Sequence, residues 1–131
     1  MSPVLKKIQS FAELSKASDS FFLDRLNFNS LMFAAVLNII HWLILYIKIK
    51  PDQTNILLHY NVVYGSDVVA KSLYIYWIPL LALILFVINF IFAKVYYKKE
   101  KLIAYFINIS QIVVQLIFLV ASLVLIVANS N

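Results

Sequence analysis

The chain has 131 residues, of which 63% are apolar and only 13% are charged, and it contains no cysteine. Ordinary soluble domains are about half apolar and about a quarter charged, and a water-soluble protein of this length could not bury so much apolar surface. The composition therefore predicts a membrane protein, and the missing cysteines exclude disulfides, thiolate metal sites and cysteine nucleophiles.

The net charge of +5 is the next constraint. A nucleic-acid-binding protein gathers its basic residues on one soluble face and interleaves them with exposed aromatic residues, and the sequence lacks that pattern. Its lysines instead flank long apolar runs, which is typical of membrane proteins. We therefore expect the lipid bilayer as a partner and no nucleic acid.

Residues 1–29 form a head before the first apolar run. They lack the short apolar core and small-residue cleavage site of a signal peptide. Two interpretations stay open for this cytoplasmic head: an amphipathic helix lying on the anionic inner leaflet, and a frayed tail. The helical interpretation places Leu5, Ile8, Phe11, Ala12 and Ser15 opposite Lys6, Gln9, Glu13 and Lys16.

Three long apolar runs predict transmembrane helices over about residues 30–47, 78–97 and 102–128. At about 1.5 Å per residue, each comes close to the ~30 Å thickness of the hydrocarbon core. Ser30 is the expected N-cap of the first helix. The connection between the second and third is so short that these two helices must form an antiparallel hairpin. The expected fold is all-α, with the membrane domain over residues 30–131.

The distribution of basic residues predicts the orientation. Eight of the eleven lie on the side that holds the N-terminus and the loop between the second and third spans, whereas Lys48, Lys50 and Lys71 lie on the other side. Because cytoplasmic loops carry an excess of Lys and Arg, we expect a multi-pass protein of the cytoplasmic membrane. Its N-terminus would be cytoplasmic, and residues 48–77 and the C-terminus would be extracytoplasmic.

Polar side chains inside the spans are candidate packing residues, because an unpaired polar group in lipid is costly. On the third span they fall on one stripe at about 100° per residue. They predict hydrogen bonds between helices, at about 0.6 kcal/mol each. The alternative is a polar path through the bilayer, although no Asp, Glu, Lys or Arg lies in the middle of a span. The candidate packing residues are Asn38, His41, Asn89, Asn108, Gln111, Gln115 and Ser122.

The same stripe suits self-association if three helices leave part of it uncovered. A homo-oligomer or a larger membrane assembly would then cover the remainder.

The outer loop, residues 48–77, carries a polar segment between two spans. Residues 56–64 are rich in Ile, Val and Tyr and predict an extended segment near the interface. Gly65 tolerates a positive φ, so we expect the chain to reverse at residues 64–66. A short interfacial helix over residues 68–77 would follow, capped by Ser66 or Asp67, with Asp67 paired to Lys71.

The outer loop also resembles a segment found between two spans of small bacterial membrane proteins of unknown function. That segment reads Pro-Asp-Gln, then His-Phe-Asn or His-Tyr-Asn, then Gly and Asp. It occurs in the N-terminal part of the immunity protein against the sporulation-delaying toxin. The chain is also similar to short three-span proteins of reduced-genome bacteria. The matching residues here are Pro51, Asp52, Gln53, His59, Asn61, Gly65, Asp67, Lys71 and Pro79.

The resemblance covers about residues 50–97 and has departures. Leu57 stands where the pattern has proline, two extra residues separate Gln53 from His59, and Gly65 comes one place late. Relatives of the immunity protein also have more spans. The resemblance implies a recognition role for the outer loop, whereas the structural alternative is a turn kept hydrated at the headgroup level. The candidate recognition residues are His59, Asn61, Gly65, Asp67 and Lys71.

Motifs for catalysis are missing from the sequence. It has no Gly-rich phosphate loop and no histidine pair at helical spacing, and its acids outside the cytoplasm are not arranged as a general acid and base. We expect no enzyme, no cofactor and no metal site within one chain. The expected function is that of a structural or accessory interaction protein that packs through polar helix faces. The alternatives are an immunity or signalling protein that recognises a toxin or peptide at the outer loop, and a component of a small transporter.

Overall fold

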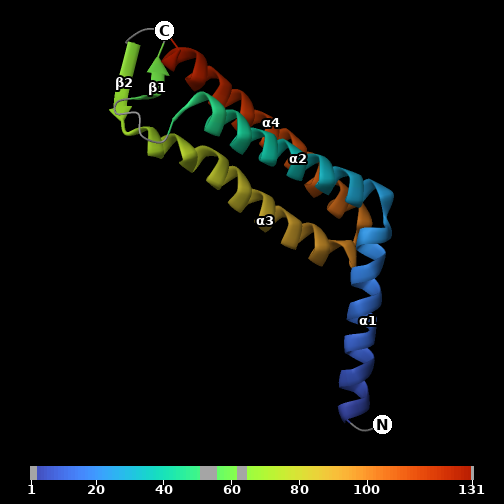
Figure 1. Ribbon diagram of the computed structural model, residues 1–131. Helices are drawn as coiled ribbons and strands as arrows, with labels where there is room; N and C mark the ends of the chain where they lie inside the picture. Colours follow the sequence, from blue (N-terminus) through green and yellow to red (C-terminus); the bar gives the residue numbers. More distant parts are fainter. Residues whose placement is uncertain (1–2, 51–55, 62–64, 131) are drawn as a thin grey trace.

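The computed structural model describes residues 3–50, 56–61 and 65–130. Its helices are α1 (Pro3–Leu23), α2 (Arg25–Lys48), α3 (Trp77–Tyr97) and α4 (Lys101–Asn129), and its strands are β1 (Ile56–Asn61) and β2 (Gly65–Ala70). A 3-10 helix, η1 (Ser72–Tyr76), joins β2 to α3. Helices α2, α3 and α4 lie side by side as a bundle, with α1 leaving one end at an angle and the strands at the other (Figure 1).

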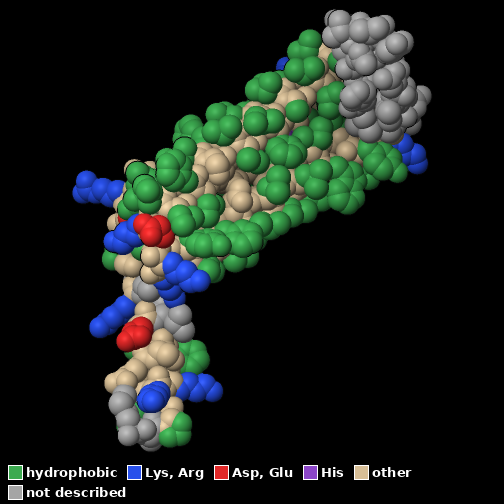
Figure 2. Space-filling view, turned by 180° about the vertical axis from the view of Figure 1, so that it is seen from behind, with side chains coloured by type: hydrophobic (Ala, Val, Ile, Leu, Met, Phe, Trp, Pro, Cys, Tyr) green, Lys and Arg blue, Asp and Glu red, His purple; other side chains and the backbone are tan. Residues whose placement is uncertain are grey.

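Within the described residues, three helical segments are long and apolar enough to cross a membrane: Arg25–Lys48, Ser72–Tyr97 and Lys101–Asn129. This finding confirms the three predicted spans. Figure 2 shows hydrophobic side chains covering the visible face of the bundle. The charged side chains lie at its two ends: Lys, Arg, Asp and Glu near α1 and along it, and further Lys or Arg at the hairpin end. A lipid environment suits such a surface, because the helices satisfy their own backbone hydrogen bonds.

The first span begins earlier than the sequence predicts. Asp24 is its N-cap, and not the predicted Ser30, which lies inside α2. The Oδ1 atom of Asp24 accepts hydrogen bonds from the backbone N–H groups of Leu26, at 3.1 Å, and Asn27, at 3.5 Å. The predicted boundary at residue 29 therefore falls inside a continuous helix. The prediction was wrong because it took the start of the uncharged run at Leu31 as the start of the helix, whereas α2 already begins at Arg25.

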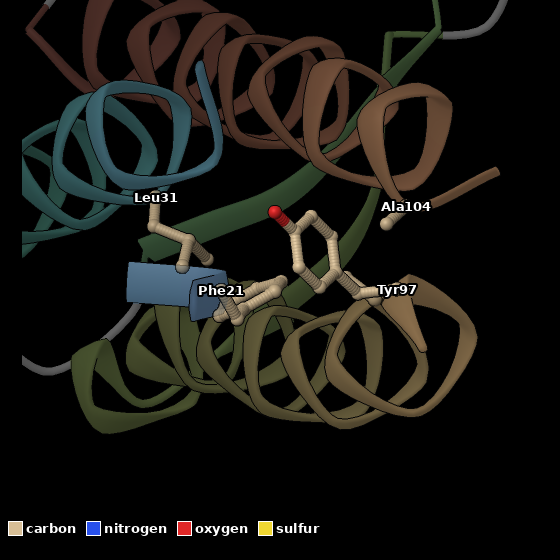
Figure 3. Close-up of a cluster of buried hydrophobic side chains, with 5 residues drawn as sticks. Phe21, Leu31, Tyr97 and Ala104 are labelled. Atoms are coloured by element: carbon tan, nitrogen blue, oxygen red, sulfur yellow. The ribbon is translucent and has the colours of Figure 1, made fainter. Parts of the chain in front are cut away.

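Helix α1 joins the bundle only near its C-terminal end. The Phe21 side chain is fully buried and packs edge-on against the Tyr97 ring, with ring centroids 5.3 Å apart. Leu31 and Ala104 complete this contact from α2 and α4 (Figure 3). Earlier in α1, Leu5, Ile8 and Phe11 are exposed. The helix is thus fixed at one end and has an apolar face that the bundle does not cover.

Buried positions on α4 repeat at spacings of three, four and seven residues, as in a coiled coil. Small side chains on the neighbouring helices allow close approach of the backbones: Ala34 of α2 and Ala82 and Ala93 of α3 are all fully buried. The buried α4 residues are Ala104, Asn108, Gln111, Gln115 and Ser122.

The membrane domain is all-helical, as predicted, and the outer loop adds a two-stranded antiparallel hairpin. β1 supplies the predicted extended segment and pairs with β2. The predicted helix over residues 68–77 is wrong in its first half: Val68–Ala70 belong to β2, and the helix is the shorter η1, with Lys71 at its N-cap position. The β-branched Val68 and Val69 favour a strand once a partner strand is present.

Asp67 and Lys71 therefore share no helix, so their expected i,i+4 spacing on one helix is wrong. The Asp67 side chain lies outside what the structure describes, and its pairing with Lys71 stays a prediction. Gly65 is the first residue of β2. Residues 62–64, and with them part of the predicted reversal at 64–66, lie outside the described residues, as do Pro51, Asp52 and Gln53.

Candidate functional site

The carboxylate of Asp24 is a hydrogen-bonding hub that joins α2, α3 and α4. Its Oδ1 atom caps α2, as described above. Its Oδ2 atom accepts hydrogen bonds from the hydroxyls of Tyr97, at 3.0 Å, and Tyr105. The Tyr97 hydroxyl also lies 3.3 Å from the carbonyl oxygen of Ser20 in α1. The Asp24 side chain thus connects the ends of α2, α3 and α4, and the Tyr97 hydroxyl extends the network to the end of α1.

The surroundings of Asp24 favour its charged form. Partial burial by itself would raise the pKa of this carboxyl, but the hydrogen bonds from Tyr105, Tyr97 and the α2 backbone outweigh it and hold the pKa below its ordinary value. Lys101 adds a cation to this region, with its Nζ atom 5.4 Å from the centroid of the Tyr97 ring. Asp24 is therefore a half-buried carboxylate that stays ionised and accepts hydrogen bonds.

The polar residues of the spans meet in pairs along the bundle axis. Nearest the hub, Asn108 Nδ2 donates to Asn27 Oδ1 at 2.7 Å. One turn further along α4, Gln111 Oε1 accepts a hydrogen bond from Asn89 of α3. These two pairs connect α4 to α2 and then to α3, so they hold α4 against both of its neighbours.

Gln115 joins all three helices at the next level. Its Oε1 atom accepts from Asn38 Nδ2 at 3.1 Å, and its Nε2 atom donates to the carbonyl oxygen of Ala82 at 2.8 Å. Asn38 Nδ2 also lies 3.4 Å from the carbonyl oxygen of Pro79. Nearer the hairpin, His41 Nε2 shares a hydrogen bond with the Ser122 hydroxyl. The structure thus brings all seven candidate packing residues together within one chain.

The stripe on α4 is covered by that chain. Asn108, Gln111 and Gln115 each have an exposed fraction of 1%, and Ser122 has none. The condition set for self-association, a stripe only partly covered by three helices, is therefore not met. A second copy cannot use these polar groups unless the bundle opens.

Some hydrogen-bonding capacity in the bundle is unused. Among the described residues, Asn27 Nδ2, His41 Nδ1, Asn108 Oδ1 and Gln111 Nε2 are buried without a hydrogen-bond partner. An unsatisfied buried polar atom costs about 1–3 kcal/mol. The amide pairs therefore fix which helix faces meet and in what register more than they raise the net stability.

The hairpin end of the bundle is closed by apolar packing. Leu45 and Ile49 of the first span form a buried cluster with Ile56 of β1 and Ile75 of η1. The Tyr76 hydroxyl donates to the carbonyl oxygen of Ile49 at 2.8 Å, and its ring stacks on Trp42. These contacts hold the base of the hairpin against the ends of α2 and α4.

The hairpin places the candidate recognition residues on two paired strands. His59 is opposite Val68, and Asn61 is opposite Gly65. The register shifts between Leu57 and His59 and again between His59 and Tyr60, so that the pairing skips Leu58 on β1 and Asp67 on β2. Such bulges bend a strand and occur often beside functional sites. Lys71, directly after β2, is exposed.

Sequence reasoning missed two residues of the site, Asp24 and Asn27. The spacing of 11 residues between Asn27 and Asn38 puts them within about 20° on one helix face, so periodicity could have found Asn27. Aspartate is a common N-cap residue, so the cap at Asp24 could have been predicted. Nothing in the sequence indicates that two tyrosine hydroxyls bind its carboxylate. Tyr97 and Tyr105 resemble interfacial aromatic residues, and only the folded bundle aims their hydroxyls at one carboxylate.

The described residues contain no group of three or more His, Cys, Asp or Glu side chains that could hold a metal ion. Comparisons of the chain with protein-family models, with curated proteins and with solved structures found no match. The resemblance of residues 50–97 to small bacterial membrane proteins therefore stays a prediction.

Proposed function

We propose that the protein is a small accessory protein of the cytoplasmic membrane, whose three-helix bundle is a scaffold for the outer hairpin. The observation that carries this proposal is the pairing of the intramembrane polar side chains with one another. Polar groups that hydrogen-bond to one another inside the bundle do not line a path for a solute. The outward faces of the helices are apolar. The proposal assigns no chemical reaction to the chain.

The orientation in this proposal follows from charge. Arg25, Lys94, Lys98, Lys99 and Lys101 lie at the end of the bundle from which α1 departs, and α1 adds further lysines. By the positive-inside rule this end faces the cytoplasm. The hairpin and the C-terminus then lie outside. Helix α1, with its exposed Leu5, Ile8 and Phe11, is suited to rest on the anionic inner leaflet.

The surface offered to a partner is the hairpin, because it projects from the bundle while its base is anchored. Ile56 of β1 is buried in the apolar cluster with Leu45, Ile49 and Ile75. An edge strand exposes backbone groups that a partner chain can pair with. A larger membrane assembly could therefore bind the hairpin without disturbing the bundle.

Site-specific crosslinking in native membranes tests this proposal. A photoreactive amino acid at Tyr60 in β1 should give one discrete polypeptide adduct. The matched probe at Tyr96, which is also an interfacial tyrosine but at the opposite end, should not give it. Failure to obtain a discrete adduct from Tyr60, or the same adduct from both positions, would contradict an accessory role for the hairpin.

A second candidate function is immunity or signalling through the same hairpin, and the bulge at Asp67 favours it. The bulge places Asp67 beside the pairs formed by His59 and Val68 and by Tyr60 and Ser66. A toxin or peptide could be recognised by the polar residues concentrated there. If this function is correct, the chain should protect cells from a toxin and need not assemble with a larger membrane complex.

Cells producing the chain should then survive exposure to the sporulation-delaying toxin better than cells that lack it. His59→Ala and Asp67→Ala should each abolish the protection at unchanged protein level, whereas Lys50→Ala should retain it. Equal sensitivity of producing and non-producing cells would rule out this candidate for that toxin.

A further inference from the structure

The bundle surface is hollowed at its hairpin end, between α2 and η1. Trp42, Leu43 and Tyr46 of α2 and Leu73 and Tyr76 of η1 surround an open groove of about 490 Å³. A second hollow of about 290 Å³ is lined by Lys71, Leu73, Tyr74 and Trp77. Leu73 lines both, so the apolar hollow and the hollow beside Lys71 are neighbours, and the two together are called the depression.

The walls of the groove are held in place by other contacts. The Trp42 and Tyr76 rings stack with their centroids 6.1 Å apart and their planes at 22°. The Tyr76 hydroxyl is fixed by its hydrogen bond to the Ile49 carbonyl oxygen. Ser72 and Ile75 are fully buried, which anchors η1 on the bundle. A groove that is formed before its ligand arrives loses less entropy on binding.

The position of the groove indicates the kind of ligand. Leu43 lies five residues before the end of α2, which is about 7 Å along the helix axis. The groove therefore opens toward the acyl chains beside the first span, while Lys71 lies at the headgroup level. The charged side chains that the structure describes at this end, Lys48, Lys50 and Lys71, are all basic and exposed.

We propose that this depression binds one phospholipid with an anionic headgroup. An acyl chain would lie against Trp42, Leu43 and Leu73, and the phosphate would lie beside the Lys71 ammonium. A lysine near an anionic headgroup contributes about 1 kcal/mol of attraction, and amphipathic aromatic rings suit the boundary between chain and headgroup. The site lies beside the hairpin of the proposed function and shares Lys71 with its candidate recognition residues.

Lipid retention by the full chain tests the site. The protein would be incorporated into nanodiscs containing equal amounts of phosphatidylglycerol and phosphatidylcholine, extracted mildly, and weighed by native mass spectrometry. We expect bound phosphatidylglycerol to exceed phosphatidylcholine on the order of fivefold, which corresponds to one lysine near a headgroup. Lys71→Gln should bring the ratio close to one, whereas Lys99→Gln, at the opposite end, should leave it unchanged.

A second pair of variants tests the apolar part of the site. Leu73 is 65% exposed, so Leu73→Trp should fill the groove without unfolding the protein, and it should reduce the retention of both lipids. Leu83→Trp, in the middle of α3, is the matched control and should retain them. Equal ratios in the parent and Lys71→Gln, or equal retention by the two tryptophan variants, would overturn the site.

Crosslinking separates a lipid from a peptide in the groove. A photoreactive amino acid at Tyr46, in living cells, should give an adduct with the mass of a phospholipid. An adduct with a polypeptide at Tyr46 would overturn the proposal in favour of a peptide groove. Because the accessory function is tested from Tyr60 on β1, the two proposals can fail independently.

Discussion

The two ends of the three-helix bundle are closed by different chemistry. At the α1 end, backbone amides and two tyrosine hydroxyls converge on the Asp24 carboxylate. At the hairpin end, Leu45, Ile49, Ile56 and Ile75 form an apolar cluster. A carboxylate hub depends on hydrogen-bond geometry and on its protonation state, whereas an apolar cluster depends on filled volume. The two ends should therefore respond to different perturbations, and mutations can separate them.

The largest effect is expected from Asp24→Ala. This change removes the N-cap of α2, at about 1 kcal/mol, and leaves the Tyr97 and Tyr105 hydroxyls without their charged acceptor. We expect the free energy of unfolding to fall by about 3 kcal/mol, measured by titrating the detergent-solubilised protein with dodecyl sulfate. Glu100→Ala is the matched control, because Glu100 is also an acidic N-cap but makes no capping hydrogen bond. Equal losses in both variants would show that Asp24 is not a hub.

At the opposite end, Ile75→Ala should cost about 2 kcal/mol, near the lower limit for removing a buried isoleucine side chain. Ile75 is fully buried in the apolar cluster, whereas Leu73, two residues earlier on η1, is mostly exposed. Leu73→Ala should therefore change the free energy of unfolding by less than about 0.5 kcal/mol. The same titration measures both variants. Similar values for the two would mean that the hairpin end is held by something other than packed volume.

Between the two ends, the amide pairs should contribute less. Gln115→Leu removes hydrogen bonds to Asn38 and to the Ala82 carbonyl, so we expect a loss of about 1 kcal/mol. Asn89→Leu removes the bond to Gln111 and should cost about 0.6 kcal/mol. Ser110→Ala is the control. Among the contacts that the structure describes, the Ser110 hydroxyl donates only to the Ile107 carbonyl oxygen, which belongs to the same helix. If both polar-to-leucine changes leave stability unchanged, hydrogen bonding does not hold α4 in place.

Two features of the bundle could be predicted from the sequence: the polar stripe on α4 and the three spans. The stripe on α4 was found because a polar residue surrounded by lipid needs a partner, and heptad spacing shows which residues share a face. The three spans were found because long apolar runs have few alternatives. Both inferences use local pattern and the solvent, and neither requires knowledge of which residues far apart in sequence meet.

The remaining features depend on contacts that the sequence does not show. The start of α2 was placed at Ser30 because the uncharged run begins at Leu31, yet Asn27 is already buried in the bundle and bonds to Asn108, 81 residues away. The end of β2 was taken for helix because a strand needs a partner strand, and here that partner is β1. Likewise, Tyr97 and Tyr105 resemble tyrosines of the membrane interface, but their hydroxyls donate hydrogen bonds to Asp24. Local propensity was overridden in each case by a tertiary partner.

The smallest effect should be the response of the Asp24 end to acid below about pH 4. The pKa of Asp24 is lowered in the folded protein, while an aspartate in an unfolded chain titrates near 3.9. Because the folded state has the lower pKa, the stabilisation is complete above about pH 4 and is lost as the pH falls through the folded pKa. Unfolding titrations between pH 4 and pH 3, in a detergent that does not titrate, should show stability falling in that range for the parent and, with the same slope, for Ile75→Ala. The slope should become smaller in Asp24→Asn, which keeps an oxygen acceptor for the tyrosines but cannot ionise. An unchanged acid slope in Asp24→Asn would place the pH dependence on another carboxyl group.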